Sequence, residues 1–333
     1  MTTRIAVNGF GRIGRNVLRA LVERGSALDV VAVNDLTDPG TLAHLLRYDS
    51  TLGRFGHSVQ VDGDALVVEG HRIQVYAERE PGKLPWAELG VDLVLEATGR
   101  FTAADAARAH LDAGARRVLV SAPSAGADVT LAYGVNTRAY DPAAHTIVSS
   151  ASCTTNALAP LAMVLDELAG IEHGFMTTVH AYTQEQNLQD GPHRDLRRAR
   201  AAGVNIVPTT TGAAKAIGLV LPGLSGKLSG DSIRVPVPVG SIVELNTTVA
   251  REVTREEVLA AYRAAADGPL GGILEYVSDP IVSSDIVGDP ASSIFDAALT
   301  RVHGTHVKVV AWYDNEWGFS NRVVDTLELL AAG

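Results

Sequence analysis

The chain has 333 residues, 46% of them hydrophobic, and a formal net charge of −10 from 28 basic and 38 acidic residues. This length predicts about two domains, since single domains contain ~100–200 residues, and the acidic balance argues against a nucleic-acid partner. One cysteine excludes a disulfide framework and a zinc site of several thiolates, so we expect no metal. No apolar run reaches the ~18–20 residues that span a bilayer, and the chain starts without a secretory pattern, so we expect a cytoplasmic protein without membrane contact.

The first half of the chain alternates strand-like and helix-like segments. Apolar runs without alternation predict strands at 4–10, 29–35, 91–98 and 116–122, and helical spacing predicts helices at 13–22, 40–47 and 103–112. Between 59 and 78, alternation broken by turn signals predicts short antiparallel strands. The strand–helix–strand order indicates a parallel sheet covered on both faces.

The character of the sequence changes after about Ala151. Longer, alternating stretches predict strands at 175–183, 232–240 and 241–250, and the prolines at 236 and 238 indicate a bend or a sheet edge. The spacing of Thr254 and Glu257 predicts a capping box that starts a helix, and 321–330 is again helical. We expect an antiparallel sheet with helices on one face in this half.

A glycine-rich turn follows the first predicted strand and opens the first predicted helix. Gly9, Gly11 and Gly14 have the spacing that permits a tight turn, close approach to a pyrophosphate and close helix packing. Asp35 ends the second strand, where a carboxylate binds ribose hydroxyls and repels a 2′-phosphate. The pattern favours a dinucleotide site for NAD rather than NADP, and the alternative is a purely structural turn.

The single cysteine, Cys153, stands in a polar cluster that precedes an amphipathic run. The neighbouring residues 152 and 154–156 carry hydroxyl and amide side chains, which predicts that the cysteine begins a helix. The helix dipole is expected to stabilise a thiolate there and to lower the pKa of the thiol. The hypothesis is a nucleophile, and the alternative is a buried structural cysteine.

A thiolate nucleophile requires a base or a cationic partner. His180 lies in a long alternating stretch that would hold it rigidly, and from spacing alone a catalytic partner and a satisfied sheet histidine remain equally open. His173, His193 and His303 are weaker candidates because they stand in loop-like contexts.

At this point several motifs indicate a family. ASCTTNALAP, MTTVHAYT, TTTGAAKAIG, RVPVP and WYDNEWGFSNRVVD, with VNGFGRIGR near the start, resemble the phosphorylating, NAD-dependent glyceraldehyde-3-phosphate dehydrogenases over essentially the whole chain. TQEQNLQDGP is most similar to actinobacterial members. The resemblance implies an α/β Rossmann dinucleotide-binding domain over 1–151, completed by a C-terminal helix over 316–333. It also implies an α+β catalytic domain over 152–315 with a mainly antiparallel sheet, and a homotetramer.

The resemblance also implies roles for individual residues. Cys153 would attack the aldehyde carbon, and His180 would be the catalytic base. The implied site for the substrate phosphate consists of Thr183, Arg198 and Arg234. The implied second anion site, for the attacking inorganic phosphate, consists of Ser152, Thr154, Thr211 and Gly212. The implied cofactor site consists of Gly9, Gly11, Arg12, Ile13, Gly14, Asp35, Arg79, Ser121 and Asn315.

The implied reaction is the conversion of D-glyceraldehyde 3-phosphate to 1,3-bisphosphoglycerate in glycolysis, with NAD reduction, through a hemithioacetal and a thioester on Cys153. One alternative is a dehydrogenase of erythrose 4-phosphate or a related phosphorylated aldehyde, although TTTGAAKA favours the triose enzyme. Another is a specialised, inhibitor-tolerant second copy. A binding role without catalysis is disfavoured because Cys153 and His180 are both present.

Overall fold

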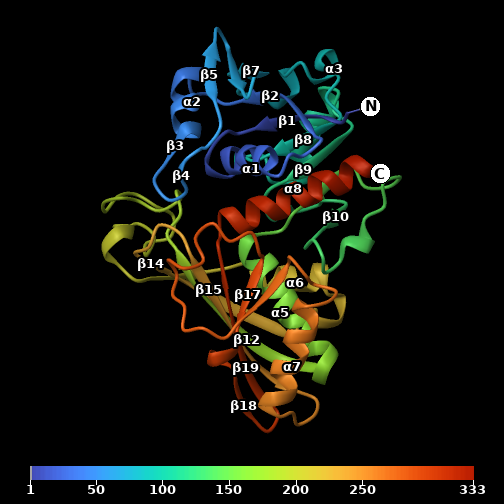
Figure 1. Ribbon diagram of the computed structural model, residues 1–333, viewed down its shortest axis with the longest axis vertical. Coiled ribbons are helices and arrows are strands. Elements are labelled where there is room, and N and C mark those ends of the chain that lie inside the picture. The colour runs from blue at the N-terminus through green and yellow to red at the C-terminus, as the bar shows by residue number, and fades with distance from the viewer. Residues whose placement is uncertain (1) are drawn as a thin grey trace. The chain divides into compact units, whose positions relative to one another are not determined.

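The computed structural model describes residues 2–333, which divide into two compact units (Figure 1). The first unit comprises residues 2–131, 137–151 and 320–333, and the second comprises residues 132–136 and 152–319. Each unit contains a large sheet of its own. Within the described residues, no helix has the length and apolar character required to cross a membrane.

The first unit is built on a nine-stranded sheet with the order β10-β11-β9-β8-β1-β2-β7-β6-β5. Its strands are β1 (Arg4–Asn8), β2 (Asp29–Asn34), β5 (Val59–Asp62), β6 (Ala65–Val68), β7 (His71–Tyr76), β8 (Leu93–Glu96), β9 (Arg117–Val120), β10 (Val129–Thr130) and β11 (Ile147–Ser149). A small hairpin joins β3 (Tyr48–Asp49) to β4 (Gly53–Arg54). The helices are α1 (Arg12–Glu23), α2 (Pro39–Arg47), α3 (Trp86–Leu89), α4 (Ala104–Asp112) and α8 (Trp317–Ala332).

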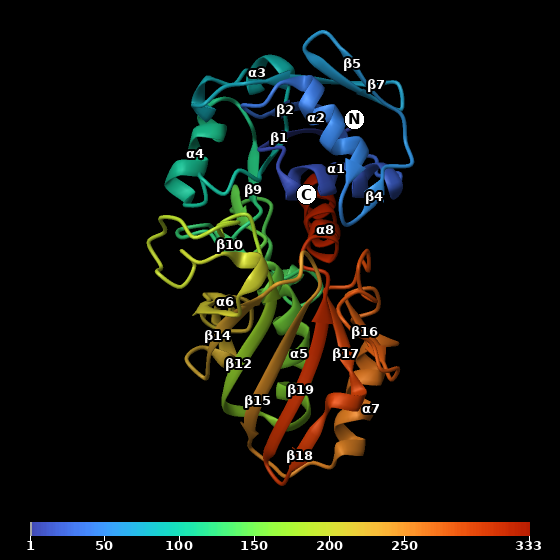
Figure 2. The same cartoon turned by 90° about the vertical axis from the view of Figure 1, so that its left-hand side faces the viewer.

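Most of this sheet is parallel, which confirms the predicted doubly wound architecture. The pairs of β1 with β2 and β8, and of β8 with β9, are parallel, whereas β5, β6 and β7 pair antiparallel as expected. Helix α4 lies on one side of the sheet and α1 on the other (Figure 2). Because β2 and β8 flank β1 on opposite sides, the carboxyl ends of these strands form the crevice where such sheets bind ligands.

A row of polar side chains crosses the carboxyl ends of these strands. Parallel register places Asn8 of β1 beside Asn34 of β2 and beside Glu96 of β8. Asn34 donates to the amide oxygen of Asn8 at 2.7 Å, and Asn8 donates to Glu96 Oε2 at 2.6 Å. The row therefore ties together the three strand ends from which the crevice loops leave.

Glu96 is a fully buried carboxylate with no lysine or arginine bonded to it among the described residues. His110 Nε2 donates to Glu96 at 3.1 Å, and the backbone N–H of Thr98 donates at 2.8 Å. The indole of Trp86 donates to His110 Nδ1 at 3.0 Å. Since an indole can only donate, Nδ1 must accept, and the proton of a neutral ring lies on Nε2, facing Glu96. The charge is stabilised by hydrogen bonds rather than by a cation.

The second unit contains an eight-stranded sheet with the main order β13-β14-β12-β15-β19-β17-β16, in which β18 pairs with β19. Its strands are β12 (Ile171–Ala181), β13 (Val207–Thr210), β14 (Leu228–Val235), β15 (Ser241–Val249), β16 (Leu274–Val277), β17 (Ser293–Asp296), β18 (Arg301–His303) and β19 (His306–Tyr313). The helices are α5 (Cys153–Ala169), α6 (Ala213–Val220) and α7 (Arg255–Ala266). The predicted capping box is confirmed, since Thr254 and Glu257 bond each other's backbone at the start of α7.

One expectation for this sheet needs correction. The strand predicted over 232–240 ends at Val235, because Pro236 and Pro238 cannot donate to a ladder and the chain bends there. The expected mainly antiparallel sheet is confirmed, and within it two pairs, β12 with β14 and β16 with β17, are parallel. The other pairs of β12, β15 and β19 are antiparallel, as predicted.

The core of the second unit lies on one face of its sheet. Alternate residues of β15, such as Val243 and Leu245, are buried, while the residues between them reach solvent. The buried set packs with apolar residues of α5 and α7, for example Leu161 and Tyr262. The helices therefore cover one face of the sheet, as the alternation predicts, and pack against its buried side chains.

The buried carboxylate of Glu96 gives a test of the first unit. We expect Glu96→Gln to lower the free energy of unfolding by about 2–4 kcal/mol, because charged hydrogen bonds are lost and an amide N–H₂ is placed against donors. Urea unfolding of the ligand-free protein, followed by circular dichroism and tryptophan fluorescence, measures the change. Glu88→Gln, which removes the same charge at an exposed position of α3, is the control. A loss below about 0.5 kcal/mol in Glu96→Gln would show that the network is not a major source of stability.

Candidate active site

Cys153 is the first residue of α5, as the sequence predicts. Ser152 is the N-cap, and its hydroxyl accepts a hydrogen bond from Thr155 N at 3.1 Å. The preceding residue, Ala151, has a φ of 57°, in the left-handed region that costs alanine about 1–2 kcal/mol. This sharp turn leads the chain into the helix, so the cysteine occupies the end of α5 where N–H groups are unpaired.

Strand pairing brings a histidine and an arginine to the same place. Parallel register sets His180 of β12 directly beside Arg234 of β14, although 54 residues separate them in the chain. The Nε2 atom of His180 lies 3.5 Å from the sulfur of Cys153. The imidazole is buried with only 4% of its surface exposed, whereas Cys153 remains partly exposed. The structure thus brings the two predicted catalytic side chains within hydrogen-bonding distance.

Two neighbours compete for the other ring nitrogen of His180. Nδ1 lies 2.7 Å from the carbonyl oxygen of Ala181 and 2.6 Å from Nη1 of Arg234. A proton on Nδ1 would be donated to the carbonyl and would leave a lone pair on Nε2, facing the thiol. A bond donated by Arg234 would instead place the ring proton on Nε2. Only the first arrangement allows His180 to act as a base toward Cys153.

The same charge affects both titrating groups. Burial, and then the positive charge of Arg234, lowers the pKa of His180 to about 3. Burial raises the pKa of the Cys153 thiol, and the charge of Arg234 opposes this rise. The expected lowering of the thiol pKa by the helix N-terminus is therefore wrong for the ligand-free protein, because desolvation outweighs it. At neutral pH the pair is a thiol and a neutral imidazole.

A tyrosine that the sequence analysis did not assign supports this pair. Tyr313 packs its ring edge-on against His180, with the ring centroids 5.9 Å apart. Its hydroxyl is bonded to Thr178 at 2.7 Å and to Thr154 at 2.9 Å. Burial raises the pKa of Tyr313, so the phenol is neutral. Tyr313 stands in the recognised WYDNEW segment, but no local pattern indicates that its ring contacts a strand over one hundred residues away.

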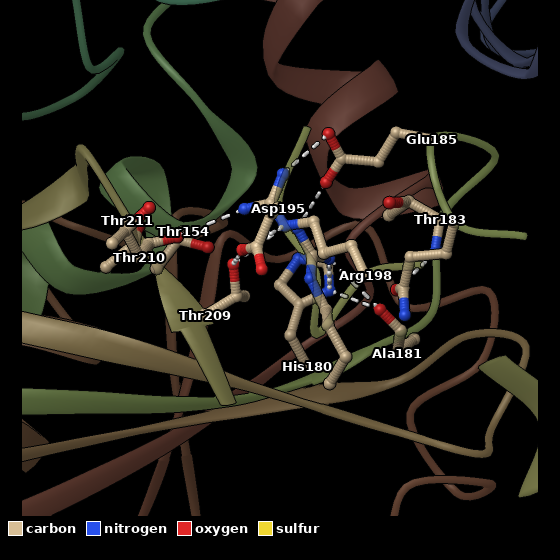
Figure 3. A network of polar contacts seen from close by, with 12 residues as sticks. Thr154, His180, Ala181, Thr183, Glu185, Asp195, Arg198, Thr209, Thr210 and Thr211 are labelled. Atoms are coloured by element: carbon tan, nitrogen blue, oxygen red, sulfur yellow. Dashed lines mark hydrogen bonds and ion pairs between the residues drawn. The ribbon is translucent and has the colours of Figure 1, made fainter. Parts of the chain in front are cut away.

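Of the three residues expected to bind the substrate phosphate, Thr183 and Arg198 lie near His180 (Figure 3), and Arg234 lies directly beside its ring. Arg198 donates to Thr209 at 2.7 Å, which fixes its guanidinium beside β13. Thr183 follows β12, and its buried hydroxyl has no hydrogen-bond partner within the described chain. Between Arg198 and Arg234 lies a carboxylate, Glu185, which accepts from both at 3.0 and 3.3 Å. The arrangement is a cationic site with a resident negative charge.

The residues expected to form the second anion site lie at the starts of two helices that pack against each other, α5 and α6. The half-buried Ser152 caps α5, and Gly212 is the exposed N-cap of α6. Thr211 accepts from Ala213 N at 3.2 Å. The hydroxyl of Thr154 is bonded to Tyr313 in the interior, so this side chain does not face solvent as a free anion ligand.

The glycine turn of the first unit has the geometry that a dinucleotide requires. Gly9 has a φ of 93°, and a Cβ there would lie 2.6 Å from the backbone of Thr98. A Cβ on Gly14 would lie 2.2 Å from the carbonyl oxygen of Gly9. A Cβ on Gly11 would meet nothing within 4 Å, and no side chain caps α1. The first turn of α1 therefore offers unpaired N–H groups and open space to an anion.

Asp35 lies where a ribose-binding carboxylate is expected. Its two oxygens accept from Phe10 N at 2.9 Å and from Thr37 N at 3.0 Å, which fixes the carboxylate at the end of β2. Arg12 forms an ion pair with Asp49, and Ile13 is half-buried in the first turn of α1.

The remaining cofactor candidates have different surroundings. Ser121 donates to the carbonyl oxygen of Glu96 at 3.0 Å and so joins the crevice. Arg79 is exposed near the end of β7. Asn315 belongs to the second unit, where its amide oxygen accepts from Ser241 at 2.9 Å. Within residues 2–333, no cluster of three or more His, Cys, Asp or Glu side chains is arranged to hold a metal ion.

A Rossmann-type unit with this glycine turn places the protein in the class of dinucleotide-dependent enzymes, and the second unit adds a cysteine–histidine pair beside an arginine. Residues 3–104 match the glyceraldehyde 3-phosphate dehydrogenase NAD binding domain, and residues 152–315 match the C-terminal domain of the same enzyme. The chain therefore belongs to the glyceraldehyde-3-phosphate dehydrogenase family.

Curated relatives support this assignment along the whole chain. The chain is 82% identical to a glyceraldehyde-3-phosphate dehydrogenase of Kitasatospora aureofaciens, over 99% of each chain. It is 60% identical to glyceraldehyde-3-phosphate dehydrogenase 2 of Streptomyces arenae, over 100% of this chain and 99% of the relative. It is 58% identical to the Mycobacterium avium glyceraldehyde-3-phosphate dehydrogenase, over 99% of each. The similarity to actinobacterial members is confirmed.

The shared influence of Arg234 on Cys153 and His180 can be tested by removing its charge. We expect Arg234→Gln to raise the pKa of both groups, because the guanidinium stabilises the thiolate and destabilises the imidazolium. The pH at which iodoacetamide alkylation of the single thiol is half-maximal should rise by about one unit, measured by intact mass. Arg251→Gln, which removes an exposed arginine remote from the cysteine, is the control. An unchanged or lower midpoint in Arg234→Gln would contradict the assignment.

Proposed function

We propose that the protein converts D-glyceraldehyde 3-phosphate and inorganic phosphate to 1,3-bisphosphoglycerate in glycolysis, with reduction of NAD. The observation that carries the proposal is the 3.5 Å approach of Cys153 and His180 beside the guanidinium of Arg234. A thiol, a neutral imidazole and a cationic anion site meet the needs of a phosphorylated aldehyde. The family of the chain supports the same reaction.

The first chemical step follows from the thiol and the imidazole. An aldehyde carbon must become tetrahedral before it can release a hydride, and the sulfur of Cys153 makes that adduct. The S–C bond forms as the carbonyl π bond breaks, and the thiol proton passes by way of His180 Nε2 to the aldehyde oxygen, so the product is a hemithioacetal with a hydroxyl group. His180 Nε2 faces the sulfur, so it can then take the hydroxyl proton as the hydride departs. The carbon is now a thioester on Cys153.

The second step uses the group-transfer potential of the thioester. A phosphate oxygen attacks the carbonyl carbon, the C–S bond breaks, and the sulfur leaves as a thiolate. Ser152, Thr211 and Gly212 stand at the starts of α5 and α6, where unpaired N–H groups favour an anion. We propose that these residues, with the backbone N–H of Thr154 because its hydroxyl bonds Tyr313, hold the attacking phosphate. We propose that Thr183, Arg198 and Arg234 hold the phosphate of the substrate.

The first unit supplies the residues that would hold NAD. Gly9, Gly11 and Gly14 fit a pyrophosphate because the open side of the turn faces the start of α1. We propose that Asp35 binds the adenosine ribose, with the remaining cofactor contacts from Arg12, Ile13, Arg79, Ser121 and Asn315. When bound, NAD supplies the hydride acceptor. In this proposal residues 1–151 with helix 316–333 form the NAD-binding domain, and residues 152–315 form the catalytic domain.

We also propose that the protein is a cytoplasmic homotetramer. Phe175 on β12, in the sheet of the second unit, is 67% exposed. The segment after β12 exposes further apolar side chains, among them Leu188 at 91% and Val204 at 78%. Apolar side chains so exposed are characteristic of contacts between copies.

The function is tested by following NADH at 340 nm with glyceraldehyde 3-phosphate. We expect NADH production that requires inorganic phosphate and is much slower with erythrose 4-phosphate. Cys153→Ser should lose nearly all activity and still bind NAD, because the serine hydroxyl is a far weaker nucleophile than a thiol. Phosphate-independent turnover, or a preference for erythrose 4-phosphate, would refute the proposed reaction.

Asp35 determines the expected choice of cofactor. Asp35→Ala should weaken NAD binding by about 1–3 kcal/mol, because charged hydrogen bonds to the ribose are lost. The preference for NAD over NADP should narrow at the same time, since repulsion of the 2′-phosphate disappears. Kinetic comparison of both cofactors measures the effect. Equal use of NAD and NADP by the unmodified protein would disprove the role of Asp35.

A further inference from the structure

The carboxylate of Glu185 occupies the centre of the cationic site, and the mechanism does not use it. Oε2 accepts from Arg198 Nη1 at 3.0 Å, and Oε1 accepts from Arg234 Nη2 at 3.3 Å (Figure 3). Each oxygen therefore bonds a different arginine. Within the described residues, Glu185 has no hydrogen bond or ion pair with any other group.

Burial differs between the carboxylate and its partners. The side chains of Arg198 and Arg234 are 17% and 14% exposed, whereas that of Glu185 is 46% exposed. Arg198 is also fixed by Thr209, and Arg234 by the carbonyl oxygen of Ala181. The cations are thus held in place, while the carboxylate stands at the rim on the loop that follows β12. It can leave without disturbing the arginines.

The site has more donors than this carboxylate can satisfy. Both oxygens of Glu185 are engaged, yet the buried hydroxyl of Thr183 and the buried Nε of Arg234 have no partner within the described chain. A phosphoryl group presents three acceptor oxygens and a charge near −2. It can therefore take the places of both carboxylate oxygens and reach donors that the carboxylate leaves unmet.

We propose that Glu185 is an internal competitor for the substrate's phosphoryl group, and so determines which anions can occupy the site. The carboxylate offsets one of the two positive charges and engages both arginines when no ligand is present, and any anion that binds there must first displace it. Displacement weakens every anion by the same factor. Relative preferences among anions are then unchanged, but an anion that binds the arginine pair weakly no longer occupies the site. This proposal rests on the assignment of Arg198 and Arg234 to the substrate phosphate.

An equal change in affinity for different anions distinguishes competition by Glu185 from a role in positioning the arginines. If Glu185 were needed to orient the arginines, its removal would weaken anion binding. If it contacted the substrate chain itself, only the substrate would respond. Competition predicts instead that two unreactive anions of different shape gain the same factor in affinity when the charge of Glu185 is removed.

The experiment measures inhibition by sulfate and by glycerol 3-phosphate at varied aldehyde concentration. Inorganic phosphate is kept saturating, so that the second anion site stays filled. In Glu185→Gln both inhibition constants should fall by one common factor of about threefold to tenfold, the range expected when two partly exposed ion pairs are lost. The rate with unphosphorylated glyceraldehyde, which lacks the anion, should not increase.

Asp190→Asn is the matched control, because it removes the same charge from the same loop at an exposed pair with Arg200. Its inhibition constants should equal those of the unmodified protein. Unchanged or higher constants in Glu185→Gln, or unequal changes for the two anions, would overturn the proposal. Absence of phosphate-dependent NADH production in the unmodified protein would instead refute the proposed function. Failure of the competitor role and failure of the proposed function are therefore distinguishable.

Discussion

The buried guanidinium of Arg234 is the charge on which the catalytic residues depend. It contacts the ring of His180 and the carbonyl of Ala181 on one side, and the carboxylate of Glu185 on the other. Burial lowers the pKa of Arg234 itself, but a guanidinium remains charged at any physiological pH. Burial is the larger cause of both pKa shifts, and this permanent charge lowers the pKa of the imidazole further while it opposes the rise in the pKa of the thiol. In the proposed reaction it also attracts the substrate anion. A lysine would not provide this planar set of donors to a backbone carbonyl and a carboxylate at once.

In the first unit a buried charge is stabilised by hydrogen bonds, whereas the site of the second unit is arranged around the cation of Arg234. The carboxylate of Glu96 is completely buried, and it accepts hydrogen bonds from Asn8 of β1, from Thr98 after β8 and from His110 of α4. These bonds lie directly beneath the loops that begin at Gly9 and Thr98. These hydrogen bonds fix the strand ends at the crevice before a dinucleotide binds. The binding loops therefore lose less conformational freedom when the ligand binds.

The sequence predicts those parts of the fold that neighbouring residues determine. The capping box of Thr254, the helix that begins at Cys153 and the turn at Gly9 all follow from spacings of a few residues. The protonation state of Cys153 does not follow from such spacings, because it depends on burial and on Arg234, which lies on a separate strand. Local pattern also gives no signal that β12 and β14 are parallel.

The buried carboxylate of Glu96 is predictable from the sequence in part, because its position is visible in the local pattern but its partners are not. An acidic residue at the end of an otherwise apolar strand is a visible anomaly in VDLVLEAT, and it signals a partnered carboxylate. Its partners His110 and Trp86 cannot be identified that way, since they come from separate segments that only the tertiary fold assembles. The role of Glu185 is hidden for the same reason, because its two arginines lie on different parts of the chain.

The solitary cysteine has a consequence for the protein under oxidative stress. Cys153 reaches solvent, and the position one helical turn later is held by Ala157, which is fully buried. A sulfenic acid formed on Cys153 has no second cysteine in the chain with which to close a disulfide. Its rescue as a disulfide then depends on a thiol from outside the chain, such as a low-molecular-weight thiol of the cell. Protection against over-oxidation is consequently a property of the surrounding thiol pool rather than of this fold.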